Sequence, residues 1–167
     1  MNIQFSRLSQ ISLNDIIELN TNGRVLKQMP LADGMNFDEK QCIAWVNAKE
    51  KQWQDYGYGP WAFVVDGKFA GWGGLQYEAG DADLALVLHP DYWGLGKQIF
   101  EKITQQAFNQ MGLQSITILL PSTRVKLQGI YQLGFALDGE AVINSQPFIR
   151  YRLYKPSCIE YGSTASR

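Results

Sequence analysis

"HPDYWGLGKQIF", residues 89–100, joins an apolar run to an amphipathic run. The apolar run before it, "LALVL", is typical of a strand in the middle of a sheet. The run after it, "IFEKITQQAF", has apolar residues at helical spacing and predicts an amphipathic helix that ends at Gly112. Gly94 and Gly96 stand where the strand gives way to the helix. Because glycine weakens a helix, its presence twice at this junction requires a physical reason.

Two interpretations of the paired glycines are open. One is a plain turn from strand to helix. The other is an anion site, because the first turn of a helix has unpaired N–H groups and a partial positive charge that a phosphate can satisfy. Glycine would then supply unusual dihedral angles and remove the Cβ that holds phosphate oxygens away, with N–H groups between Leu95 and Ile99 as donors. The junction is not a P-loop, because Lys97 is followed by Gln98 rather than by Ser or Thr.

The rest of the sequence predicts a mixed α/β (α+β) domain. We expect a strand at the start of the segment 6–20, followed by a helix that Ser12 and Asp15 cap. A loop over 22–36 then leads to a second helix, which Asn36 and Glu39 cap. Further predictions are a hairpin over 61–77 with Asp66-Gly67 at its turn, strands over 83–89 and 115–121, a short helix that ends at Gly134, and two final strands around 135–142 and 147–154. The crossover over 83–120 requires one parallel pair of strands, and open α/β sheets bind ligands at the carboxyl ends of such strands.

Composition excludes several classes of protein. The 167 residues are 46% apolar and 19% charged, with a net charge of −1, so we expect no nucleic-acid partner. No apolar run reaches the roughly 18–20 residues that span a bilayer, so we expect no membrane partner, and the N-terminus predicts a cytoplasmic protein. Cys42 and Cys158 lack metal-ligand spacing and are expected to be reduced, with no metal bound. We expect one domain over residues 1–160 and a disordered tail over 161–167.

The order of these elements, with "HPDYWGLGKQI" and "YQLGF" (131–135), resembles the GNAT superfamily of acetyl-CoA-dependent N-acetyltransferases. The pyrophosphate loop of that family reads Gln/Arg-x-x-Gly-x-Gly/Ala, which puts Trp93 in the first position and Gly96 in the fourth. "PDYWGLG", "GYGPWAFVVDGKFAGWGGL" and "PFIRYRL" look like the branch that acetylates N-terminal amines of ribosomal proteins. The resemblance covers residues 4–154. Gln98 departs from it, because the family has Gly or Ala there.

The resemblance implies a single GNAT-like domain with a mixed, mostly antiparallel central sheet of about six or seven strands flanked by about four helices. It implies transfer of an acetyl group from acetyl-CoA, the co-substrate, to a primary amine by direct attack in a ternary complex, without a metal. The acceptor would be a small molecule or a peptide amine, and the protein a monomer or homodimer. The cofactor-binding residues it implies are Leu86, Val87, Leu88, Trp93, Gly94, Leu95, Gly96, Lys97, Gln98, Ile99 and Arg124.

Three residues are candidates for the base that deprotonates the amine. Asp83 stands where the related branch often has a Glu, and a carboxylate can act through water; the other interpretation is a polar residue at the start of a strand. His89 has a suitable pKa range, but Pro90 holds it extended and a structural role competes. Glu78 is the third candidate.

Tyr131 is the candidate general acid. Relatives often carry a Tyr four residues before the Gly of "Tyr-x-x-x-Gly-Phe", whereas Tyr131 lies three before Gly134 and Ile130 holds the matching place. One residue is about 100° of helical rotation, so a half-buried aromatic is the competing interpretation. Two alternative functions also stay open: an acetyl-CoA-binding or interaction module with a degenerate site, and an acetyltransferase of polyamines, amino acids or antibiotics.

Overall fold

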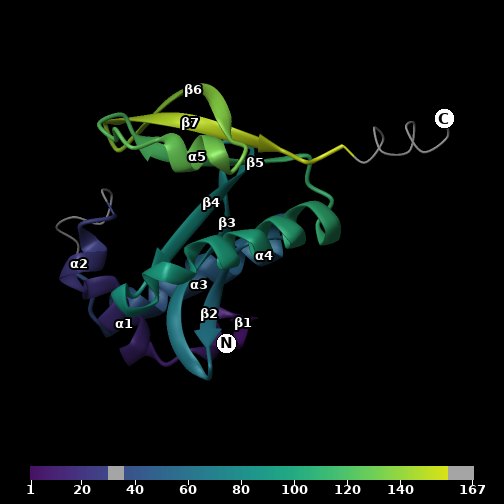
Figure 1. Ribbon diagram of the computed structural model, residues 1–167. Coiled ribbons are helices and arrows are strands. Elements are labelled where there is room, and N and C mark those ends of the chain that lie inside the picture. Colours follow the sequence, from purple (N-terminus) through teal and green to yellow (C-terminus); the bar gives the residue numbers. More distant parts are fainter. Residues whose placement is uncertain (30–35, 158–167) are drawn as a thin grey trace.

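One open sheet of seven strands, in the order β1-β2-β3-β4-β5-β7-β6, organises the computed structural model, which describes residues 1–29 and 36–157 (Figure 1). Every neighbouring pair is antiparallel except β4 and β5. This confirms the predicted mixed, mostly antiparallel sheet and its one crossover. The strands are β1 Ile3–Ser6, β2 Pro60–Val65, β3 Lys68–Glu78, β4 Asp81–Leu88, β5 Ser115–Pro121, β6 Ala136–Ile143 and β7 Gln146–Tyr154.

Helices cover both faces of the sheet. They are α1 Leu13–Thr21, α2 Gly23–Leu26, α3 Glu39–Tyr56, α4 Gly96–Gln105 and α5 Gln128–Gln132, and a π-helical turn, Gln106–Gln110, extends α4 toward Gly112. On one face Ile99 and Ile103 of α4 pack with residues such as Phe63 and Leu84. On the other, Ile16, Val25 and Val46 of α1, α2 and α3 pack with Ala62 and Trp72. In the described part of the chain, no helix is long and apolar enough to cross a membrane.

Several local predictions are confirmed. Ser12 accepts a hydrogen bond from the N–H of Asp15 (3.2 Å) and so caps α1. Asp66 and Gly67, with φ of 49° and 82°, make the turn between β2 and β3. Gly112 and Gly134, with φ of 69° and 101°, follow the helical segments they were expected to end.

Other local predictions are wrong. Residues 22–36 are not all loop, because Asn22 accepts from the N–H groups of Arg24 and Val25 and starts α2. The cap of α3 is Asp38, two residues beyond Asn36, since Asp38 accepts from the N–H of Gln41 (2.8 Å). The first strand also precedes its predicted place. Residues 30–35 and the predicted disordered tail, 161–167, lie outside the described residues.

The paired register between the parallel strands β4 and β5 is short. β4 pairs with β3 along its whole length, from Asp81 to Leu88, but its Cα register with β5 is limited to Asp83 opposite Thr117. In Figure 1, β4 runs away from the group formed by β5, β6, β7 and α5. The end of β4, from Ala85 to Leu88, therefore has one edge without a described strand partner.

Arg152 of β7 ties four strands together at the base of this divergence. Its guanidinium donates two hydrogen bonds to Asp81 of β4 (2.9 and 3.0 Å), one to Ser115 of β5 (2.9 Å) and one to Asp138 of β6 (2.9 Å). The paired, bidentate geometry with Asp81 is the strong form of such contacts. The network holds β4 against β5 and β7 at the start of β4, while its other end is free to diverge.

Glycine at position 71 lets β3 lie close to β4. A Cβ built there would be 2.2 Å from the carbonyl oxygen of Val87 and 2.9 Å from Cα of Leu88, so backbone would have to move. We expect Gly71→Ala to lower the free energy of unfolding by about 1–3 kcal/mol and the melting temperature by roughly 2–4 °C for each kcal/mol, measured by chemical and thermal unfolding. Gly129→Ala in α5, where a Cβ meets nothing within 4 Å, is the control and should not destabilise. Equal melting temperatures for Gly71→Ala and wild type would contradict this packing.

Candidate functional site

The two glycines of the junction adopt ordinary helical conformations. Pro90–Leu95 form a 3-10 helix that continues into α4 at Gly96, whose φ and ψ are −55° and −43°. Neither Gly94 nor Gly96 has a positive φ, so the expectation of unusual dihedral angles is wrong. A Cβ at Gly94 would meet nothing within 4 Å, and one at Gly96 would meet only Leu86 Cδ2, at 3.7 Å. Neither backbone conformation nor packing within the described chain requires glycine here, and the space above this backbone is open.

A cavity of about 460 Å³, here called the junction cavity, lies between the end of β4 and the start of α4. Six of the predicted cofactor-binding residues line it, together with Val25, Gln28 and Met29: these six are Leu86, Val87, Leu88, Trp93, Gly96 and Arg124. Leu95 and Ile99 instead bury their side chains in the core beneath α4, and Gly94, Lys97 and Gln98 are exposed on the surface.

Trp93 fixes the end of β4 beside this cavity. Its indole N–H donates to the carbonyl oxygen of Leu88 (2.9 Å), so the strand's last carbonyl has a partner where β5 has diverged. The guanidinium of Arg24, from α2, lies 4.8 Å from the centre of the Trp93 ring. Arg24 was not predicted from the sequence, because only the fold brings α2 beside the junction.

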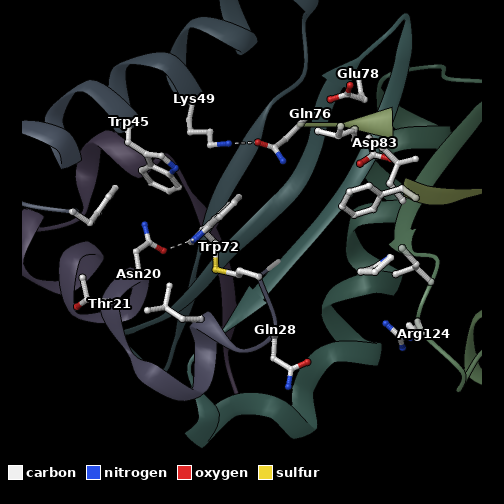
Figure 2. A pocket seen from close by; sticks show the side chains of 18 residues that line it. Asn20, Thr21, Gln28, Trp45, Lys49, Trp72, Gln76, Glu78, Asp83 and Arg124 are labelled. Carbon is white, nitrogen blue, oxygen red and sulfur yellow. Dashed lines mark hydrogen bonds between the residues drawn. The ribbon is translucent and has the colours of Figure 1, made fainter. Parts of the chain in front are cut away.

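A second cavity, here called the central cavity, has a volume of about 450 Å³ (Figure 2). From α3, β3 and β4 its polar lining receives Lys49, Gln76, Glu78 and Asp83, and Asn20 and Thr21 of α1, Gln28 and Arg124 complete it. Its apolar lining comes from both parts of the sheet and from α3, and includes Phe37, Trp45, Trp72, Leu119, Leu120 and Phe148. Gln28, Met29 and Arg124 line both cavities, so the two adjoin.

Asp83 lies where β4 and β5 meet, and its carboxyl lines the central cavity. Oδ1 accepts a hydrogen bond from the hydroxyl of Thr117 (2.7 Å), a side chain that is itself buried. Burial raises the pKa of Asp83 to about 7, and the neighbouring carboxylates of Glu78 and Asp81 act in the same direction, against the hydrogen bond from Thr117. A group with this pKa exchanges its proton near neutral pH, as a general base or acid must.

Lys49 faces the same cavity from α3. Its ammonium donates to Oε1 of Gln76 and lies 5.0 Å from the ring of Trp72 and 5.4 Å from that of Trp45. Burial lowers the pKa of Lys49 to about 8. The indole N–H of Trp72 donates to Asn20 (3.0 Å), which fixes the ring. The spacing of Trp45 and Lys49 by four residues was the available signal, because such residues share one helix face.

Among the described residues, neither His89 nor Tyr131 lines the junction cavity or the central cavity. His89 caps the 3-10 helix through Nδ1, which accepts from the N–H of Asp91 (3.2 Å), and borders a different hollow. Tyr131 is 49% exposed and packs edge-on against Tyr151, while Ile130 beside it is buried. The structure thus brings Asp83 and Glu78 together, whereas the roles proposed for His89 and Tyr131 stay predictions. Within 1–29 and 36–157, no three His, Cys, Asp or Glu side chains are grouped as metal ligands.

Residues 4–124 match the family model described as the acetyltransferase (GNAT) domain. The match covers well over half of the chain, so the protein belongs to the GNAT acetyltransferase family. The family transfers acetyl groups from acetyl-CoA to amines, which supports an N-acetyltransferase and agrees with the resemblance seen in the sequence.

Solved structures share the whole fold at low sequence identity. A protein described as a GNAT-family acetyltransferase from Bordetella pertussis is 14% identical, with a TM-score of 0.69 over 92% of this chain and 99% of that one. A spermidine N-acetyltransferase chimera described as from Vibrio cholerae and hSSAT is 18% identical, with a TM-score of 0.66 over 92% of this chain and 96% of that one. A protein from Vibrio cholerae described as a ribosomal-protein-serine acetyltransferase is 14% identical, with a TM-score of 0.66 over 93% and 95%. These likenesses confirm the predicted GNAT-like fold.

Replacement of Asp83 by Asn should change how stability depends on pH. The folded protein binds the Asp83 proton more tightly than the unfolded chain does, so stability from this group is present below about pH 4 and is lost as the pH rises through about 7. Asn does not titrate in this range. We therefore expect the melting temperature of Asp83→Asn, relative to wild type, to be higher at pH 8 than at pH 4, by roughly 2–4 °C for each kcal/mol of pH-dependent stability that wild type loses. A difference that stays constant with pH, followed by scanning calorimetry, would contradict the raised pKa.

Proposed function

We propose that the protein transfers the acetyl group of acetyl-CoA to a primary amine held in the central cavity, by direct attack in a ternary complex. The observation that carries this proposal is the contiguity of the two cavities at Gln28, Met29 and Arg124, with Asp83 in the one and the glycine junction in the other. An acyl donor and an acceptor in adjoining cavities can meet at the end of β4. We keep the expectations of a cytoplasmic protein and of a monomer or homodimer as part of this proposal.

The residues of the junction cavity fit acetyl-CoA. The open space above Gly94 and Gly96 admits a pyrophosphate to the N–H groups in the first turn of α4, where the helix dipole favours negative charge. Arg124 would contact a phosphate. The diverging edge of β4, Leu86 to Leu88, would offer backbone N–H groups to the thioester oxygen, where negative charge grows during attack.

Asp83 is proposed as the base. An amine must be neutral to attack, and at pH 7 a lysine-type amine, pKa about 10.4, is neutral in under roughly one molecule in a thousand, against about a tenth for an α-amine. A carboxylate with a pKa near the working pH is suited to take the proton, directly or through water. The thiol that leaves has a reference pKa near 8.5, so it needs little help from an acid such as Tyr131.

Acceptor classes are separated by a turnover screen that counts the thiol released from acetyl-CoA. The panel contains N-terminal peptides, amino acids, polyamines and aminoglycosides, because one structural neighbour is described as a spermidine acetyltransferase and another as a ribosomal-protein acetyltransferase. Thiol release with any amine supports the proposal. Binding of acetyl-CoA without release across the panel would instead favour the binding module with a degenerate site.

Asp83→Asn should reduce turnover by about 100-fold near pH 7, the usual contribution of a general base. Asn keeps the size of the side chain but cannot take the proton. Activity should partly recover at higher pH, where more of the amine is already neutral, and the Kd for acetyl-CoA should stay unchanged. Thiol-release kinetics over pH 6–9 and calorimetry measure the two effects. Normal turnover at pH 7 would remove Asp83 from the mechanism and turn attention to Glu78.

Gly96→Glu should abolish binding of acetyl-CoA, because it adds bulk and negative charge where the pyrophosphate is proposed to lie. The backbone at Gly96 is ordinary helix and its Cβ position is free of clashes, so the variant should still fold. Gly129→Glu in α5, where a Cβ also meets nothing, is the matched control and should bind normally. Calorimetry with acetyl-CoA, beside thermal unfolding, measures both. Retained affinity in Gly96→Glu would place the site elsewhere.

A further inference from the structure

Two side chains of opposite charge in the central cavity, Lys49 and Asp83, approach each other through Gln76. Lys49 reaches Gln76, and Gln76 is the Cα partner of Asp83 on the neighbouring strand. Directly opposite residues of antiparallel strands have Cβ atoms about 4.5–5.5 Å apart, so one amide side chain separates the Lys49 ammonium from the Asp83 carboxyl. Glu78 lies on the Asp83 side (Figure 2). The cavity is thus positive at its α3 end and negative where β4 meets β5, and Arg124 adds a second cation where the central cavity adjoins the junction cavity.

The positive end lacks a compensating anion among the described residues. Within 1–29 and 36–157, no carboxylate oxygen lies within 4.0 Å of the Lys49 ammonium. Its hydrogen-bond partner, Gln76, is neutral and occupies one of its three N–H donors. A half-buried cation of this kind is stabilised when an anion binds beside it.

The two indole rings at this end are unsuitable for a second cation. Stacked or converging indoles often bind the ammonium groups of ligands. Here the ammonium of Lys49 itself lies over Trp72 and Trp45, at 5.0 and 5.4 Å. A ligand ammonium brought to the same rings would be repelled by Lys49. This end of the cavity therefore disfavours polyamines, which carry several positive charges.

Most of the remaining lining is apolar, and its other polar members are Asn20, Thr21, Gln28 and Arg124. Phe37 and Trp45 meet edge-on with ring centres 5.9 Å apart, and Trp45 and Trp72 at 5.0 Å. Leu120 and Phe148 close the side formed by β5 and β7. A volume of about 450 Å³ lies within the range of small-molecule sites, about 300–1,000 Å³.

We propose that the acceptor is an amine with a carboxylate beside it and an apolar side chain, that is, a free apolar amino acid, and that Lys49 binds the carboxylate while the amine faces Asp83. This proposal rests on the acetyl transfer proposed above and names its substrate class. The amine nitrogen forms a bond to the acetyl carbon, the carbon–sulfur bond breaks, one amine proton passes to Asp83, and the thiolate takes a proton from solvent. The acceptor carboxylate is unchanged, and it orients the amine away from Lys49 and toward the thioester.

The test compares matched acceptors. Phenylalanine and leucine are set against their carboxamides, with spermidine as the polycation, and kcat/KM is measured by thiol release at pH 7. We expect the amino acids to exceed their carboxamides at least about tenfold, the size of one charge-assisted contact of about 1.4 kcal/mol. The carboxamides have the less basic amines, so more of each is neutral at pH 7, which biases the comparison against this result.

Variants of Lys49 test whether this residue causes the preference for amino acids over their carboxamides. Lys49→Met keeps the aliphatic stem against the two Trp rings and removes the charge; it should erase the preference, mainly through KM for the amino acid, with KM for acetyl-CoA unchanged. Lys49→Arg should retain part of the preference. Lys51→Met is the matched control on the same helix, because Lys51 is exposed and pairs with Asp55 (2.7 Å), and it should keep the wild-type preference.

Each contrary outcome is decisive. Equal or faster turnover of carboxamides or spermidine, or a preference that survives in Lys49→Met, would overturn the anion site and leave acetyl transfer intact. Absence of thiol release with every acceptor would contradict acetyl transfer itself. Calorimetry with N-acetylphenylalanine then decides the anion site: binding to wild type and not to Lys49→Met supports it, and no binding to wild type overturns it.

Discussion

The limited contact between β4 and β5 is the constraint on which both cavities depend. Two parallel strands that paired along their whole length would leave no room between them, and the end of β4 would hydrogen-bond to β5. Here the register is confined to Asp83 and Thr117, and the carbonyl of Leu88 takes its hydrogen bond from Trp93 instead. The Arg152 network fastens the strands at the closed end. The divergence is therefore part of the folded structure and needs no ligand to produce it.

Burial in the central cavity acts on its two ionisable groups in opposite directions. It raises the pKa of Asp83 to about 7 and lowers that of Lys49 to about 8, because a partly dry environment disfavours both charged forms. Neither group has an ion-pair partner of opposite charge among the described salt bridges, and each has a neutral hydrogen-bond partner, Thr117 or Gln76. A structure selected for stability alone would place a direct ion pair or apolar residues here. The retention of two separated, half-buried groups favours a role in binding and proton transfer.

Features that depend on adjacent residues could be predicted from the sequence, whereas features that depend on tertiary contacts could not. The Ser12 cap, the Asp66-Gly67 turn and the strand–junction–helix unit follow from a few adjacent residues, so they could be predicted. Asp83 and the edge from Leu86 to Leu88 were named through the resemblance to the family; the structure puts Asp83 in the central cavity and the edge in the junction cavity, and their roles stay predictions. Lys49 and Arg24 were missed. The spacing of Trp45 and Lys49 puts both on one face of α3, but only the fold shows that this face meets the cavity of Asp83 and that Arg24 of α2 lies over Trp93.

The same distinction separates the candidates for proton transfer. Asp83 and Glu78 are on neighbouring strands, and since Gln76 is opposite Asp83, the two-residue period of the strands puts Glu78 on the same face as Asp83. His89 stands beside the junction in the chain, but its Nδ1 accepts from the backbone of Asp91, and this contact holds the ring at a hollow on another part of the surface. Proximity in sequence to a binding loop therefore does not imply that a side chain faces the ligand.

The two glycines of the junction, Gly94 and Gly96, matter because they lack a side chain. Each lies in helical backbone, where alanine would be more favourable by roughly 0.5–1 kcal/mol, and at neither position would a Cβ clash with the described chain. A turn that needed glycine would show a positive φ, as Gly67 does, and a close packing contact would show a short Cβ distance, as Gly71 does. With both causes excluded, the two glycines agree with the proposed pyrophosphate site, which needs an uncovered stretch of N–H groups at the start of α4, beside the cavity that Gly96 lines. A polypeptide gains nothing from such bare backbone in its own fold; a ligand with phosphate oxygens does.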